Sequence, residues 1–180
     1  MIHPPTHSST HTPTHSPIRA PIRPPLAVII RAATADEDGI VGRHFYQMWL
    51  DNGVPAAAIT ADWSDRIQQF IDHARQSLGY QAFLAEVQGV VVGSAGCQRF
   101  AGLYSPILQD SERCDGYIWG VYVEPAYRRH GIATQLTEQA IAYLRLSGCT
   151  RAVLNAAPMG KPVYERLGFA PANVMELPLS

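Results

Sequence analysis

Apolar residues recur along most of the chain with two different periods, and these periods predict its helices and strands. Residues 34–53, 61–78 and 132–148 repeat apolar side chains at three- and four-residue steps, which predicts three amphipathic helices. The first is expected to begin with a capping box, because Thr34 is followed three residues later by Glu37. The aromatic residues of the second, Trp63 and Phe70, are expected in the core.

Short runs rich in β-branched and aromatic residues predict the strands. They cover residues 26–32, 80–87, 90–99, 117–123, 151–156 and 174–179. Gln88-Gly89 is expected to form a hairpin turn, and residues 159–167 a short helix that ends at Gly168. The resulting order of elements predicts a single mixed α/β domain over residues 26–180, with antiparallel hairpins and one crossover.

The first 25 residues differ in composition from the rest of the chain. They contain half of the 14 prolines, four of the seven histidines and no acidic residue. Histidines recur at every fourth position, but the prolines oppose a helix that would bring them together on one face. We therefore predict a disordered Pro/His/Thr-rich tail with adventitious metal affinity at most.

Composition and charge exclude several functions. The net charge of −1 over 180 residues gives no broad positive field for nucleic acid. Three cysteines without a C-x-x-C spacing argue against a disulfide framework or a metal site and fit a reducing, cytoplasmic location. No apolar run is long enough to span a membrane. The sequence leaves a homodimer open.

A short basic loop joins the strand over residues 117–123 to the helix that starts at Ile132. Pro125 ends the strand, and Arg128, Arg129 and Gly131 follow within six residues. A helix start presents unpaired N–H groups at the positive end of the helix dipole, so this loop is a candidate diphosphate site. The alternative is a solvated basic helix start. The chain contains neither a P-loop nor a G-x-G-x-x-G fingerprint.

Two segments resemble known motifs. Arg128-x-x-Gly131-x-Ala133, preceded by Val121-Tyr122-Val123-Glu124-Pro125, resembles the pyrophosphate loop of GNAT N-acetyltransferases. Tyr164-Glu165-Arg166-Leu167-Gly168-Phe169 resembles the segment that closes the last helix of that family. The resemblance covers essentially residues 27–180 and implies the GNAT fold. That fold is a mixed, largely antiparallel twisted sheet of about six to seven strands flanked by about four helices.

The resemblance also implies acetyl-CoA as co-substrate and assigns its contacts. Val121, Tyr122 and Val123 would run alongside the pantetheine arm, with unpaired N–H groups at Val121 and Val123. The diphosphate would be held by the loop residues Arg128, Arg129, His130, Gly131, Ile132, Ala133 and Thr134. Relatives commonly carry an asparagine at the position of Ala157, and Asn155 is a substitute candidate. Lys161 is a further candidate, near the adenosine phosphates.

Acetyl transfer needs a proton for the departing thiolate and a way to deprotonate the amine. Tyr164 is the candidate acid, because a phenol near the sulfur can donate its proton as the thiolate leaves. Asp115 is the preferred candidate base; Glu112, Glu86 and a water relay are the alternatives.

Taken together, these features predict direct transfer of an acetyl group from acetyl-CoA to a primary amine of an unidentified small-molecule or peptide acceptor. The resemblance places the acceptor near residues 54–60 and the adjoining helix ends. The alternative is a catalytically inactive acyl-CoA-binding sensor or interaction module. A working Tyr164 would favour the enzyme.

Overall fold

The computed structural model describes residues 26–102, 107–172 and 177. The predicted tail and, apart from Leu177, the strand predicted over residues 174–179 lie outside this part of the chain. The order of the elements agrees with the prediction: strand, two helices, three strands, helix, strand, helix. The fold is therefore mixed α/β, as predicted.

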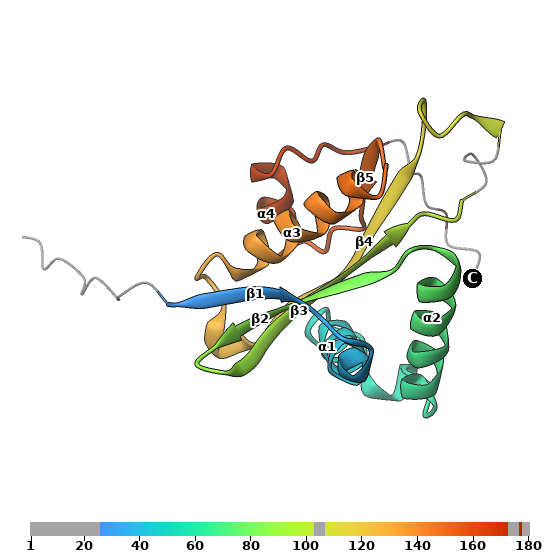
Figure 1. Cartoon of the computed structure of the whole chain (residues 1–180). Helices are drawn as coiled ribbons and strands as arrows, with labels where there is room; N and C mark the ends of the chain where they lie inside the picture. Colours follow the sequence, from blue (N-terminus) through green and yellow to red (C-terminus); the bar gives the residue numbers. More distant parts are fainter. Residues whose placement is uncertain (1–25, 103–106, 173–176, 178–180) are drawn as a thin grey trace, which may run out of the picture.

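A single twisted sheet forms the middle of the domain (Figure 1). Its strands follow chain order: β1 (Val28–Ala32), β2 (Gln81–Val87), β3 (Val90–Arg99), β4 (Asp115–Val123) and β5 (Arg151–Val153). The first four are antiparallel to their neighbours, and β5 runs parallel to β4. Five strands thus lie within the described residues, where about six to seven were predicted for the whole chain.

Helices cover both faces of the sheet. α1 (Asp38–Asp51) and α2 (Trp63–Ser77) lie on one face, and α3 (Ile132–Leu146) and α4 (Lys161–Arg166) lie on the other (Figure 1). The predicted capping box precedes α1: the Thr34 N–H donates to the Glu37 carboxylate at 2.9 Å. None of the helices in the described ranges is long and apolar enough to cross a bilayer.

The side chains on the two faces of the central strand β4 belong to two different hydrophobic cores. Ile118, Val121 and Val123 belong to the core under α3. Tyr117 and Trp119 belong to the core under α1 and α2. Strict alternation would put Val121 on the same face as Trp119, so the alternation must change between them.

Candidate active site

The edge of β4 that faces β5 is paired over only part of its length. Pairing joins Asp115, Gly116 and Tyr117 to β5, and no further pair follows within the described residues. At the point of divergence, Asn155 Nδ2 donates a hydrogen bond to the Tyr117 hydroxyl at 3.2 Å. From Ile118 onward, no strand of the described part of the chain pairs with this edge of β4, which makes it a candidate ligand site.

A β-bulge interrupts β4 on its other edge, where it pairs with β3. Trp119 lies opposite Gly96 and Tyr122 opposite Ser94, so two residues of β4 face one residue of β3. Gly120, in the bulge, has a φ of +60°, a conformation that favours glycine. The sequence analysis missed this bulge. The sequence did contain a signal for it. Gly120 stands inside the predicted strand, and the aliphatic residues Ile118 and Val121 are three positions apart, which breaks a two-residue alternation.

Backbone donors of β4 point toward the open edge. The Glu124 N–H donates to the Val92 carbonyl of β3 at 2.8 Å. Since successive N–H groups of a regular strand point to opposite edges, the N–H group of Val123 points away from β3. This orientation supports the prediction for Val123, whereas Val121 lies in the bulge, where regular alternation does not apply. The N–H of Tyr122 points toward β3, and its side chain packs beside His44 of α1, which disfavours contact with a pantetheine arm.

The basic loop before α3 has the backbone of an anion site. Arg129 and Gly131 both have positive φ, +66° and +78°, and Gly131 is the residue that caps α3. The first backbone bond of the helix runs from the Gln135 N–H to the Gly131 carbonyl, so the N–H groups of the preceding turn lack intrahelical acceptors. A Cβ built on Gly131 would meet nothing within 4 Å, and the loop surface is therefore accessible.

The Arg128 side chain turns away from this loop. Its Nε donates to the Val123 carbonyl at 2.8 Å, and its Nη2 pairs with the Asp51 carboxylate at the end of α1. Burial opposes ionisation of Asp51, but hydrogen bonds from Arg128 and Gln47 outweigh it and lower the pKa of that carboxyl. Arg128 therefore ties α1 to β4. These contacts disfavour the predicted role of its guanidinium in binding phosphate.

Tyr164 lies on α4 and is half-buried. Its ring packs edge-on against Phe169, with centroids 5.9 Å apart, and a Cβ built on Gly160 would lie 3.1 Å from it. Burial raises the pKa of the phenol, which therefore keeps its proton at neutral pH. A general acid must carry its proton at the working pH, and Tyr164 meets this requirement.

Asp115 has the environment of a structural carboxylate. Its side chain is 4% exposed and lies between Arg113 and Arg151, at 3.1 and 2.9 Å. Burial opposes its ionisation, but hydrogen bonds from Arg151 and Arg113 outweigh burial and lower its pKa. A carboxylate with both oxygens occupied and a lowered pKa is a poor proton acceptor, so the prediction of Asp115 as base is disfavoured. Of the other candidates, Lys161 lies on exposed α4 and faces Glu165 at 3.8 Å.

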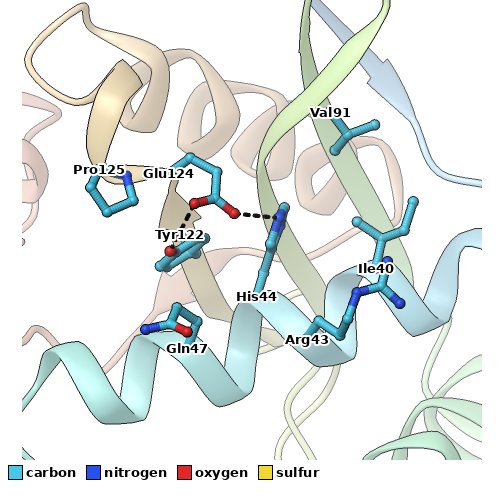
Figure 2. Close-up of a pocket in the computed structure, with 8 residues that line it drawn as sticks. All are labelled: Ile40, Arg43, His44, Gln47, Val91, Tyr122, Glu124 and Pro125. Atoms are coloured by element: carbon cyan, nitrogen blue, oxygen red, sulfur yellow. Dashed lines mark hydrogen bonds and ion pairs between the residues drawn. The ribbon is translucent and has the colours of Figure 1, made fainter.

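A polar cluster that the sequence analysis did not identify lies between α1 and the end of β4 (Figure 2). His44 Nδ1 is 2.9 Å from the Ser94 hydroxyl, and its Nε2 is 3.7 Å from Glu124, which also accepts from the Tyr122 hydroxyl at 3.3 Å. Burial, with a smaller effect of the Arg43 charge, lowers the pKa of His44 to about 4. His44 is therefore neutral at pH 7. The adjoining cavity has a volume of about 460 Å³.

A second cavity, of about 360 Å³, lies between α1, α2 and the segment that connects them. It is lined by Phe45, Tyr46, Trp49, Val54, Ala58, Ile59, Thr60, Trp63, Arg66 and Ile67. The resemblance pointed to residues 54–60 for the acceptor, and four of the lining residues come from that segment. The prediction that the aromatic residues of α2 are core is wrong for Phe70, which is 43% exposed, while Trp63 lines the cavity.

Comparison with known proteins defines the class to which this geometry belongs. The acetyltransferase (GNAT) family matches residues 44–169, and the chain belongs to this family.

Three relatives illustrate the similarity. A glucosamine 6-phosphate N-acetyltransferase of Trypanosoma brucei brucei is 30% identical over 53% of this chain, and the match spans 61% of that relative. A GCN5-related N-acetyltransferase from Ralstonia eutropha JMP134 superposes with a TM-score of 0.72 at 28% identity, over 85% of this chain and 99% of that one. A predicted acetyltransferase from Clostridium acetobutylicum, solved with acetyl-CoA, superposes with a TM-score of 0.69 at 21% identity, over 84% of this chain and 96% of that one.

Proposed function

We propose that this protein transfers an acetyl group directly from acetyl-CoA to a primary amine. The observation that carries the proposal is the edge of β4 beside the bulge at Gly120, which pairs with no strand beyond Tyr117 among the described residues and toward which the Val123 N–H points. We propose the Val121 N–H as the second donor. Donors fixed in a rigid strand can stabilise the negative charge that develops on a thioester carbonyl oxygen. A binding module without turnover would need neither such donors nor a proton donor.

The chain also fits the other parts of acetyl-CoA. The loop around Arg129 and Gly131 offers backbone N–H groups at the start of α3, where a diphosphate gains from the helix dipole. Arg129 adopts a positive φ that costs a non-glycine residue of the order of 1–3 kcal/mol, a strain typical of ligand-binding backbone. Asn155 lies at the divergence of β4 and β5, where its side chain donates to the Tyr117 hydroxyl, and we propose that it contacts the pantetheine arm.

The chemical step is the replacement of a C–S bond by a C–N bond. The neutral amine nitrogen attacks the thioester carbonyl carbon, the C–N bond forms, and the C–S bond breaks with its electron pair on sulfur. Tyr164 gives its proton to that sulfur, and the extra proton on nitrogen leaves to water. We propose water for this role because Asp115 is held between two arginines. Water then restores the proton of Tyr164, so no group is consumed.

A thiol-release assay with acetyl-CoA and a panel of primary amines tests the proposal. We expect at least one amine to raise the release of free thiol well above the rate without amine, with a mass gain of one acetyl group on that amine. Tight acetyl-CoA binding without acceleration by any amine would contradict the proposal and favour the sensor alternative.

Two glycines at opposite ends of α3 give a matched test of the phosphate loop. Gly131 and Gly148 have nearly the same φ, +78° and +80°, so valine strains both positions equally. Only Gly131 adjoins the helix start. We expect Gly131→Val to weaken acetyl-CoA binding at least tenfold in calorimetry, while Gly148→Val binds like the parent. Equal binding by both variants would refute the loop assignment.

A further inference from the structure

The cavity between α1 and α2 has a lining that is informative about the acceptor. Four of its ten residues are aromatic: Phe45, Tyr46, Trp49 and Trp63. Four more are aliphatic, and the two polar ones are Thr60 and Arg66. A volume of about 360 Å³ lies at the lower end of the range of small-molecule sites. The cavity therefore suits a compact molecule with an apolar body.

The cavity adjoins the proposed site of acetyl transfer. Phe45, which lines it, packs edge-on against Trp119 with centroids 5.2 Å apart. A Cβ built on Gly120 would lie 3.3 Å from the Phe45 ring. The width of one ring thus separates the cavity from the bulge. A flexible two- or three-atom link between an apolar body and an amine can extend past Phe45 to the open edge of β4.

The walls of the cavity combine rigidity with exposed apolar surface. The rings of Tyr46 and Trp63 stack between α1 and α2, with centroids 4.4 Å apart and planes inclined by 20°. Trp49 is 45% exposed, although its ring packs edge-on against Phe45 with centroids 6.0 Å apart. An aromatic group in the cavity would cover this indole and gain from ring–ring contact as well as from burial.

Charge in the lining restricts the acceptor further. Among the described lining residues there is no carboxylate, so a second or third ammonium group would lose water without gaining a partner. The single cation, Arg66, already donates to Asp62 at 2.8 Å, which disfavours recognition of a phosphate. A single ammonium can rest against an aromatic face. Apolar surroundings also favour the neutral amine that attacks, which reduces the need for a side-chain base.

On these grounds we infer that the acceptor is an arylalkylamine: one primary amine joined by a short link to an aromatic ring. The inference rests on the proposed function and narrows it. It separates this chain from relatives whose names specify glucosamine 6-phosphate or aminoglycosides, because those acceptors are polar and carry phosphate or several amines.

The test is the thiol-release assay with 2-phenylethylamine, tryptamine, n-propylamine, spermidine and glucosamine 6-phosphate. We expect kcat/KM for the two arylalkylamines to exceed that for each of the other three at least tenfold. Comparable or greater turnover of propylamine, spermidine or the sugar phosphate would overturn the acceptor class and leave the proposed function intact. Failure of every amine would instead overturn both.

A pair of variants checks that the cavity is the origin of the selectivity. Trp49→Ala should lower the preference for 2-phenylethylamine over propylamine at least fivefold. Phe100→Ala is the matched control, since Phe100 is similarly exposed, 41% against 45%, and does not line the cavity. It should retain the parent's preference. A Trp49→Ala variant that binds acetyl-CoA normally and keeps the full preference would overturn the inference.

Discussion

Acidification should destabilise this protein through His44 before it affects the carboxylates. Burial lowers the pKa of His44 to about 4, from an ordinary value of 6.5. As the pH falls, His44 therefore becomes protonated in the unfolded chain at a higher pH than in the folded protein. The contribution of His44 to the free energy of unfolding is fully present above about pH 6.5 and is lost as the pH decreases toward 4.

The size of this loss follows from the two pKa values. A difference of about 2.5 units corresponds to about 3 kcal/mol in full, of which about 2 kcal/mol is lost between pH 7 and pH 5. His44 is only 7% exposed, so solvent screening reduces this figure little. Glu37, whose pKa is lowered from 4.5 to about 2 by hydrogen bonds from Arg31 and the Thr34 backbone, acts at lower pH.

Urea unfolding at pH 7, 6 and 5 measures the effect. The comparison protein is the double variant His44→Phe with Ser94→Ala, which removes both partners of the 2.9 Å hydrogen bond and so leaves neither unsatisfied. We expect the parent to lose about 2 kcal/mol more than the double variant between pH 7 and pH 5. Parallel curves for the two proteins over this interval would refute the argument that His44 is held neutral.

Three further outcomes follow from the site. Tyr164→Phe should lower kcat about a hundredfold with little change in KM for acetyl-CoA. The control is Tyr143→Phe, since Tyr143 lies on α3 with its hydroxyl bonded to the Gly79 carbonyl at 3.0 Å, and this variant should keep the parent's kcat. A Tyr164→Phe variant as active as the parent would show that another group protonates the thiolate. Arg128→Ala should reduce the free energy of unfolding by about 1–3 kcal/mol, because Asp51 loses its partner, and should leave calorimetric acetyl-CoA affinity within a few-fold. Asp115→Asn should destabilise the fold by about 2 kcal/mol in urea yet change kcat/KM less than twofold; a hundredfold loss would restore Asp115 as base.

The local parts of the fold were predictable from the sequence. β3 has the predicted bounds, Val90–Arg99, and Gln88 and Gly89 both adopt the positive φ that a tight hairpin requires. The first turn of α3 begins at Ile132, where the hydrophobic period changed. In each case the determining information lies within a few neighbouring residues.

Features that depend on distant segments were not predictable in the same way. β5 ends at Val153, three residues before the predicted end, because it diverges from β4 there. Asp115 was the preferred candidate base, but the fold brings Arg151, 36 residues later in the chain, next to its carboxylate. Helical periodicity also gave the same signal for Trp63 and for core residues, since a pocket lining and a core both place apolar side chains on one helix face.

The open edge of β4 also has a consequence for association between molecules. Unpaired backbone groups at a sheet edge can accept a strand from another chain and so begin aggregation. Here Arg128 occupies the Val123 carbonyl and places a charge beside it, while the bulge at Gly120 twists the strand and breaks a regular ladder. The Arg128 charge and the bulge both hinder a strand of another molecule from pairing with this edge, as such features do in other sheets. An edge that we propose to bind acetyl-CoA is thus protected against pairing with neighbouring chains.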